Sequence, residues 1–383
     1  MKICAIICEY NPFHNGHLYH LREAKRLSGA DAILCIMSGN FVQRGEAAIL
    51  NKYIRAKHAI QAGADAVIEL PSVFATSNAE LFAKGAIHIL SSIPAVDTLC
   101  FGAETADAAA FLNAANLLNN EPEQVSARIK ALTNDGLSYA KARAIAWDGV
   151  LPNDLLSSPN NILGLEYTKA ILSTNANIRI LPISRIGNHY NSKQLNEQTA
   201  SATAIRNGIS ENVSVSKYVP DFVECDLPCD LQCNLELLEK YAILSRNTNE
   251  IKRVCDCTEG LENAFKKAAL LDAPLSETLT SARYTTSRIR RIALQNLLNI
   301  DEQLIREALT APLYLKVLAI NATRKDLLTA LSAGISPIII RTQDKHQLCP
   351  TAIKCMQKDE ISDQIYNLIY AQTQKEKNIF ISL

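Results

Sequence analysis

The sequence predicts an α/β fold in which a Rossmann-like doubly wound parallel sheet is followed by a mostly helical C-terminal domain. Short apolar runs alternate with helical patterns over residues 1 to about 105, which is typical of parallel strands joined by crossover helices. From about residue 210 the hydrophobic periodicity becomes helical. The 383 residues suffice for two domains of roughly 100 to 200 residues each. We place the boundary between residues 210 and 211.

The first domain, residues 1–210, supplies the strands of the sheet. Apolar runs predict strands at 2–7, 32–37, 66–70, 98–101 and, later in the chain, 178–183. Helical patterns separate the early strands at 17–27, 51–62 and 79–90. Gly29 and Gly63 follow the first two of these helices, where C-caps are expected. An Ala-rich and Leu-rich stretch at about 106–172 predicts a helical insertion.

The second domain, residues 211–383, is predicted to be mostly helical. Its periodicity indicates helices at 231–244, 261–271, 287–298, 301–309 and 313–319. One further strand is expected at 335–340.

The charge is balanced, with 39 basic and 39 acidic residues. A neutral chain with 48% hydrophobic residues is neither disordered nor a strongly basic nucleic-acid coat. Any contact with nucleic acid then needs a local basic patch rather than a large positive field.

The eleven cysteines are an odd number, and several lie in or beside strand-like apolar runs. This usage favours free thiols in a reducing cytosol over a disulfide framework. No apolar run is long enough for a signal peptide or a membrane span, so we expect a cytoplasmic protein. Later cysteines do not form a usual zinc knuckle, so we expect no metal there; these are Cys225, Cys229, Cys233, Cys255 and Cys257.

The motif with chemical meaning lies between the first strand and the first helix, where His14 and His17 flank Gly16. A loop that leaves the first strand of an α/β sheet and enters a helix is a phosphate-binding position. Two histidines three residues apart can donate to one phosphate group, and a glycine between them permits close approach. The pattern indicates nucleotidyl transfer, although a metal-binding pair or an incidental helix start would give the same spacing.

Residues 11–17 resemble the His-x-Gly-His signature of the nucleotidylyl transferase superfamily, and residues 201–206 resemble its second signature, a Ser/Thr-rich turn that ends in arginine. Within that superfamily, the stretches 37–46, 67–71 and 159–164 resemble the tRNA(Met) cytidine acetate ligase family. The resemblance extends along most of the chain and is strongest before about residue 210.

This resemblance implies an enzyme that uses ATP to activate acetate as acetyl-adenylate. The acetyl group then passes to N4 of the wobble cytidine of elongator tRNA(Met), and Mg²⁺ is expected with the ATP. Residues 1–210 would form the ATP-binding catalytic domain and residues 211–383 the tRNA-binding domain, with no stable protein partner evident. Two other functions stay open: an adenylyltransferase or acid-activating ligase that acts on a small metabolite or carrier, and a non-catalytic RNA-binding protein that senses nucleotides.

The resemblance also assigns roles to individual residues. His14 and His17 would be catalytic and would contact the phosphates. The residues implied to bind ATP are Ile7, Cys8, Glu9, Tyr10, Asn11, Pro12, Phe13, His14, Asn15, Gly16, His17, Leu18, Tyr19, His20, Gly102, Asn160, Arg185 and Arg206. As alternatives, Gly102 could be only a turn glycine, and Arg185 and Arg206 could be surface ion-pair partners.

A basic stretch at residues 281–299 is the best local candidate for RNA contact, because it holds four arginines, no acid and one tyrosine able to stack on a base. The candidates are Arg283, Tyr284, Arg288, Arg290 and Arg291. A solvated helix face would explain the same pattern. Arg44 and Lys52 are weaker candidates for contacts with phosphates or tRNA.

Overall fold

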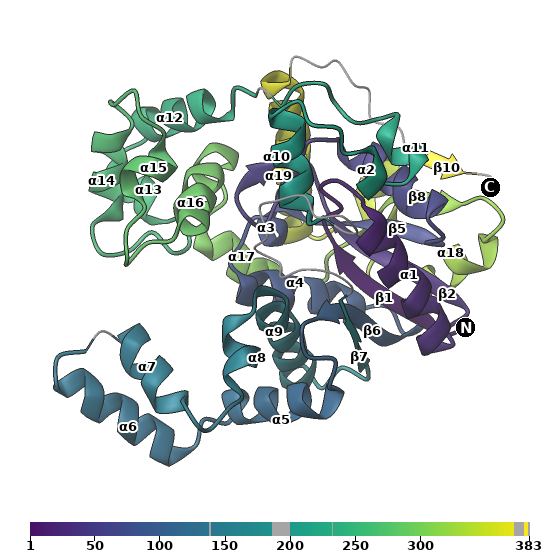
Figure 1. The fold of residues 1–383 in the computed structure, drawn as a ribbon. Coiled ribbons are helices and arrows are strands. Elements are labelled where there is room, and N and C mark those ends of the chain that lie inside the picture. Colours follow the sequence, from purple (N-terminus) through teal and green to yellow (C-terminus); the bar gives the residue numbers. More distant parts are fainter. Residues whose placement is uncertain (138, 186–199, 232, 371–378, 382–383) are drawn as a thin grey trace.

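The computed structural model describes residues 1–383 except 138, 186–199, 232, 371–378 and 382–383. At its centre is a mixed sheet with the strand order β10-β8-β5-β2-β1-β6-β7, and β9 pairs with β8 (Figure 1). The strands are Ile3–Cys8 (β1), Ala32–Ser38 (β2), Ala66–Leu70 (β5), Val96–Ala103 (β6), Arg179–Ser184 (β7), Leu315–Asn321 (β8), Ile338–Ile339 (β9) and Ile379–Ile381 (β10). Outside this sheet, Phe41–Val42 (β3) and Glu46–Ala47 (β4) form a small antiparallel hairpin.

The five strands β5, β2, β1, β6 and β7 are parallel, which confirms the predicted doubly wound sheet. From β1 the chain builds outward through β2 to β5 and then places β6 and β7 on the opposite side of β1. The order of the strands therefore reverses between β1 and β6. Open α/β sheets bind ligands beyond the carboxyl ends of the strands at such a switch point.

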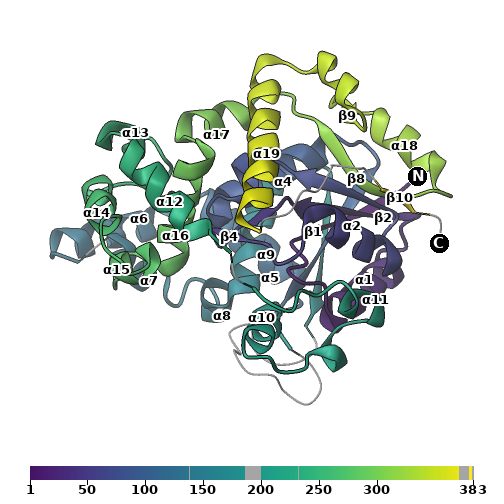
Figure 2. The same ribbon diagram turned by 90° about the horizontal axis from the view of Figure 1, so that it is seen from above.

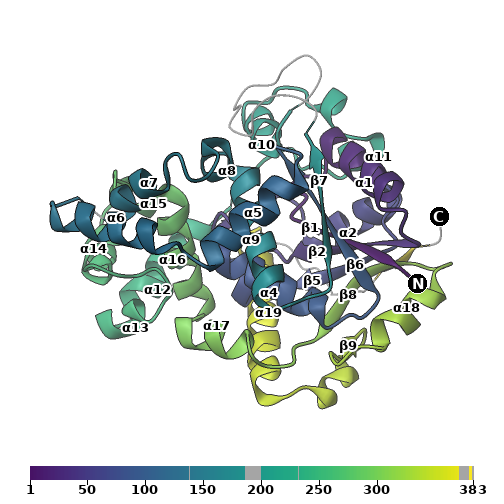
Figure 3. The ribbon, with the colours of Figure 1, turned by 90° about the horizontal axis from the view of Figure 1, so that it is seen from below.

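Alternating side chains of the strands pack into two separate cores. One face of β1 and β2 contributes to the core beneath α1, α2, α10 and α11. The other face contributes to the core beneath α3, α4, α5 (Ala108–Asn119) and α9 (Pro159–Ser173). Figure 3 shows the second layer from below. The first set is Asn15–Ser28 (α1), Lys52–Gln61 (α2), Ala202–Ser210 (α10) and Asp221–Glu224 (α11). The second begins with Ser72–Ala75 (α3) and Ala79–Ser91 (α4).

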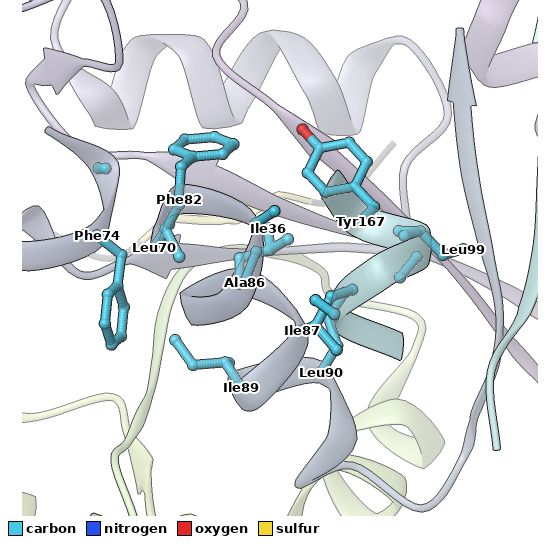
Figure 4. Packing of buried hydrophobic residues seen from close by; sticks show 14 of the residues in the cluster. Ile36, Leu70, Phe74, Phe82, Ala86, Ile87, Ile89, Leu90, Leu99 and Tyr167 are labelled. Carbon is cyan, nitrogen blue, oxygen red and sulfur yellow. The ribbon is translucent and has the colours of Figure 1, made fainter. Parts of the chain in front are cut away.

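Helix α4 shows how tightly the second core is packed. Phe82, Ala86 and Leu90 face the strands and the helix that carries Tyr167 (Figure 4). On the same helix, a Cβ at Gly85 would lie 2.1 Å from the ring of Phe74. Phe74 belongs to α3, so a side chain at position 85 would force α3 and α4 apart, and glycine is required for their contact.

The described residues of the stretch 106–172 form helices, as predicted. These are Ala108–Asn119 (α5), Glu123–Asn134 (α6), Tyr139–Trp147 (α7), Asn153–Ser157 (α8) and Pro159–Ser173 (α9). Helices α5 and α9 pack against the sheet layer, whereas α6 and α7 pair with each other and project away from it (Figure 1). The insertion therefore covers the sheet and extends beyond it.

A helical lobe follows, with its own core around Ile243, Phe265 and Ile289. Its helices are Leu235–Ser245 (α12), Thr248–Lys252 (α13), Leu261–Ala268 (α14), Leu275–Leu279 (α15) and Thr286–Leu298 (α16). The chain then continues through Glu302–Ala308 (α17), Lys325–Ser332 (α18) and Pro350–Ile369 (α19). Figure 2 shows α19 between the helical lobe and the sheet.

The predicted helix at 313–319 is wrong, because this segment is strand β8, which pairs antiparallel with β5. Nearly every residue of β8 is buried, so its apolar run lacks the alternation that distinguishes a strand from a buried helix. The expected strand at 335–340 is present as β9. The division between residues 210 and 211 remains a prediction, but β8 and β10 return the end of the chain to the first domain's sheet.

Candidate active site

A pocket opens beyond the carboxyl ends of β1, β6 and β7, at the switch point of the sheet. Most of the predicted ATP-binding residues line it: Ile7, Cys8, Glu9, Tyr10, Asn11, His14, Gly16, His17, Tyr19, His20, Gly102, Asn160, Arg185 and Arg206. Pro12, Phe13, Asn15 and Leu18 are not among the lining residues. Phe13 instead packs in the core, against Tyr10 and Phe222. The loop thus contributes both to the pocket wall and to its support.

His14 and His17 form a reciprocal cap at the start of α1. His14 is the N-cap residue, so the helix begins at Asn15, slightly earlier than the sequence predicted. The backbone N–H of His17 donates to Nδ1 of His14, and the backbone N–H of His14 donates to Nδ1 of His17, both at 3.3 Å. The two rings stack with their centroids 3.6 Å apart. Two backbone donors and two imidazoles thereby fix each other's positions.

This cap determines the tautomer of both rings. An Nδ1 that accepts a hydrogen bond carries no proton, so the proton of each neutral imidazole is on Nε2. Burial lowers the pKa of His14 to about 3, and the nearby Arg185 contributes to the same shift. Burial likewise lowers the pKa of His17, with further contributions from His14 and Arg185. Both side chains are therefore neutral Nε2–H donors at physiological pH.

A side chain at position 16 would press against the ring of His14. A Cβ at position 16 would lie 3.0 Å from Cε1 of His14. The group that closely approaches Gly16 is thus the imidazole ring of His14, a side chain of the same motif.

The other predicted nucleotide residues surround the same pocket. Gly102 lies within β6, so the alternative of a turn glycine is wrong. The Arg185 guanidinium is 3.5 Å from Oδ1 of Asn160, and Asn160 donates to Glu104 at 2.7 Å. His20 lies beside the thiol of Cys100, at 3.4 Å, and burial lowers its pKa to about 4. One guanidinium therefore lies among three neutral histidines, which suits a polyanionic ligand.

The opposite wall of the pocket comes from Glu9 and from the β3–β4 hairpin. Gln43, Arg44 and Glu46 line this wall, although the sequence assigned no site role to Gln43 or Glu46. The backbone N–H of Gln43 donates to Glu9 at 2.7 Å, and burial raises the pKa of Glu9. The stretch 37–46, which carries part of the family resemblance, contains all three hairpin residues. This resemblance was the sequence signal that could have assigned Gln43 and Glu46 to the site.

Arg206 connects the second signature to the first. Ser201 caps α10 by accepting from the backbone N–H of Ala204, which orients the first turn of that helix. One turn later, Arg206 donates to the carbonyl oxygen of Asn11 at 2.7 Å. Its guanidinium also lies 3.5 Å from a carboxylate oxygen of Glu46. Arg206 is therefore fixed at the pocket wall.

Lys52 has neither of its expected roles, because it is fully buried away from the pocket lining. Its ammonium group is 2.9 Å from Glu69 and also pairs with Asp363. Lys316 lies 2.9 Å from the other oxygen of Glu69. The side chain is thus part of a buried charge cluster that joins α2, β5, β8 and α19.

The basic stretch at 281–299 forms the end of the α15–α16 loop and helix α16. Arg283 is largely exposed and pairs with Glu259 at 2.6 Å, while Tyr284 donates to the same carboxylate. Arg288 donates to the carbonyl oxygen of Asp256. Two of the predicted RNA contacts are engaged within the protein or partly buried: Arg290 pairs with Glu46 beside the pocket, although its side chain is 40% exposed, and Arg291 is partly buried.

All eleven cysteines are free thiols. In the described part of the chain, no group of three or more His, Cys, Asp or Glu side chains is arranged to hold a metal ion. In the same part, no helix combines the length and apolar character needed to cross a membrane.

The switch-point pocket and its histidine cap define a nucleotide-binding transferase with the His-x-Gly-His loop. A model of the family described as HIGH Nucleotidyl Transferase matches residues 1–379, and the chain belongs to this class. It is 40% identical to the tRNA(Met) cytidine acetate ligase of Thermoanaerobacter sp. (strain X514), over 97% of this chain and 96% of that protein. The corresponding protein of Acetivibrio thermocellus is 36% identical over 97% and 95%. The chain therefore belongs to the tRNA(Met) cytidine acetate ligase family.

Solved structures agree with this assignment. The crystal structure of Thermotoga maritima TmcAL (apo, form I) matches with a TM-score of 0.92 and 28% identity, over 100% of both chains. The Thermotoga maritima TmcAL structure bound with alpha-thio ATP (form II) matches with a TM-score of 0.88, also at 28% identity over 100% of both chains.

Proposed function

We propose that this chain is an ATP-dependent ligase that activates acetate as acetyl-adenylate and transfers the acetyl group to N4 of the wobble cytidine of elongator tRNA(Met), giving N4-acetylcytidine. The names of its relatives support this reaction. The alpha-thio ATP named for the Thermotoga structure supports the use of ATP. The observation that carries the proposal is the reciprocal cap of His14 and His17, because it leaves both Nε2–H groups free of the backbone at a pocket that also contains Arg185.

In the first step an acetate oxygen attacks the α-phosphorus of ATP. The new bond joins acetate to AMP, and the bond to the β-phosphate breaks as pyrophosphate leaves. His14 and His17 donate from Nε2 to phosphate oxygens, where negative charge increases in the transition state. Because both imidazoles stay neutral, they act as hydrogen-bond donors rather than as acids. Arg185 and Arg206 supply the fixed positive charge.

In the second step the exocyclic amine of the cytidine attacks the acetyl carbonyl carbon. AMP leaves with the bridging oxygen, and the amine nitrogen loses one proton. The predicted ATP residues that line the pocket hold the nucleotide, among them Gly102, Asn160 and Arg185. Mg²⁺ enters as part of MgATP, because a pyrophosphate leaving group requires charge neutralisation.

The tRNA would dock on the helical lobe beside the pocket. Arg283 is the most accessible member of the predicted RNA set, with its side chain 66% exposed, whereas Tyr284 and Arg288 are partly buried. We propose a catalytic unit made of residues 1–210 together with the later strands and α19, and a tRNA-binding unit made of α12–α16. Reduced thiols and tRNA occur together in the cytoplasm, which is the location we propose.

The test is transfer of radiolabelled acetate into purified tRNA, with acetate-dependent AMP formation measured with and without tRNA. We expect label in elongator tRNA(Met) and none when ATP is omitted. His17→Ala should lower acetyl-adenylate formation by about 10²- to 10³-fold while tRNA binding is retained.

Two outcomes would select the other functions. If another small acid supports AMP release and acetate never enters tRNA, the protein is a ligase for a metabolite or carrier. If ATP binds but no acceptor leads to its consumption, the protein is a nucleotide-sensing RNA-binding protein.

A further inference from the structure

Glu46 connects the nucleotide pocket to the helical lobe. One of its carboxylate oxygens lies 3.5 Å from Arg206, and the other forms an ion pair with Arg290 of α16. The Glu46 side chain is 26% exposed and lines the pocket. A single carboxylate therefore joins an arginine of the second signature to an arginine of the predicted RNA stretch.

The backbone of the hairpin makes this connection rigid. Gly45 has a φ of +74°, and a Cβ there would lie 2.5 Å from the backbone nitrogen of Arg291. It would also lie 2.6 Å from the carbonyl carbon of Arg290. The turn that precedes Glu46 thus rests directly on α16, so a displacement of α16 would displace Glu46 as well.

The charges explain why two arginines share one acid. If Glu46 paired with Arg206 alone, it would cancel the positive charge that Arg206 offers to a phosphate. Arg290 draws on the same carboxylate, so the three groups keep a net charge of +1 at the pocket wall. Arg290 also lies near Glu239 of α12, a buried carboxyl whose pKa is raised well above its usual range by burial and by Glu236, with an opposing contribution from Arg290. The Arg290 side chain is 40% exposed, but its guanidinium is engaged by Glu46, which fits a positioning role better than a role as a phosphate contact of bound RNA.

We propose that Glu46 is a positioning residue for adenylation, and that Arg290 acts through Glu46 on Arg206 in the first half-reaction, before tRNA takes part. This inference rests on the proposed function. The helical lobe would then contribute to the formation of acetyl-adenylate as well as to tRNA docking.

The experiment measures acetate-dependent exchange of pyrophosphate into ATP without tRNA, in Arg290→Gln, Glu46→Gln and the double variant. We expect each single variant to raise the KM for ATP about tenfold. The increase in the double variant should be at least threefold smaller than the product of the two single increases, because the effects of coupled neighbours are not additive. Arg290→Lys should restore most of the affinity, since it keeps the charge. Arg306→Gln, which breaks an exposed pair with Glu302 on α17, is the matched control and should leave the exchange unchanged.

Three results would overturn the inference. One is an unchanged KM for ATP in Arg290→Gln with a loss of tRNA binding alone, which would make Arg290 an RNA contact. Another is full additivity in the double variant. A fall in thermal midpoint that Arg290→Lys does not reverse, with the KM rising in parallel, would also count against it, since a structural defect would then explain the loss.

Failure of the proposed function gives a different result. The wild-type protein would then show no acetate-dependent exchange at all. The coupling would in that case be read from the Kd for ATP in the same five variants by calorimetry, with the same tenfold and threefold expectations.

Discussion

Replacing Lys52 by methionine should destabilise the protein strongly, because its charge is fully buried among acids. Its ammonium group pairs with Glu69 and Asp363, and Lys316 completes the cluster. The two lysines balance these two carboxylates. A third carboxyl, Asp359, has a pKa raised to about 7, mainly by burial and by the negative charge of Glu69. The wild-type cluster therefore carries little net charge.

Lys52→Met would leave two buried carboxylates facing one lysine. Removing one partner of a buried ion pair costs about 3–5 kcal/mol, since an uncompensated charge remains. We expect a loss of this size in the free energy of unfolding, measured by urea denaturation. Lys84→Met is the control, because Lys84 pairs with Glu80 at 2.6 Å on the surface, with both side chains about half exposed. Such a pair contributes only about 0–1 kcal/mol.

A second variant separates charge balance from packing. Lys52→Met combined with Glu69→Gln removes one charge of each sign, so at least half of the lost stability should return. The reasoning would be refuted if Lys52→Met unfolded within about 1 kcal/mol of the wild type, or if the double variant were no more stable than the single one.

Three further predictions concern the histidine loop. His17→Ala should lower acetate-dependent pyrophosphate exchange by about 10²- to 10³-fold, as expected for one lost oxyanion donor, while filter binding of tRNA stays at the wild-type level; full activity would remove His17 from the phosphate site. The folded pKa values of His14 and His20, about 3 and about 4, lie below the unfolded value of about 6.5, so the unfolded chain binds more protons between these limits. The free energy of unfolding is therefore unaffected by these histidines above pH 6.5, and it decreases by about 1.4 kcal/mol per histidine for each pH unit below that value. Urea denaturation at pH 7.5, 6.5 and 5.5 measures this decrease, and equal stability at all three pH values would contradict the assigned neutral state. Gly16→Ala should reduce the exchange about tenfold with less than about 1 kcal/mol change in stability, because alanine favours the helix while its Cβ displaces the ring of His14; an unchanged rate would show that the ring position is not critical.

The sequence predicted the parallel strands because each is a short apolar run with turn or helix signals at its ends. It failed at β8, where burial on both faces removes the alternation that marks a strand. The antiparallel pairing of β8 with β5 joins segments about 250 residues apart, which no local pattern reports.

The sequence predicted those parts of the site whose residues lie close together along the chain. His14, Gly16 and His17 act within one helix start, so spacing alone indicated their joint role. Glu46 could not be found in this way, because its importance depends on α16 lying against the hairpin. Lys52 was misjudged for a related reason: its acidic partners come from β5 and from α19.

The buried cluster also has a consequence for synthesis of the chain. Asp363 follows Lys52 by 311 residues, so a ribosome that adds about 5–20 residues per second needs roughly 15–60 seconds to deliver it. In the later part of that interval the nascent chain already contains the histidine loop and the second signature, yet Lys52 lacks one of its two acidic partners. The same delay applies to β8, which closes the exposed edge of β5. A nascent chain stalled before β8 should therefore remain open to proteases at β5 and α2, even though the sequence of the nucleotide pocket is already complete.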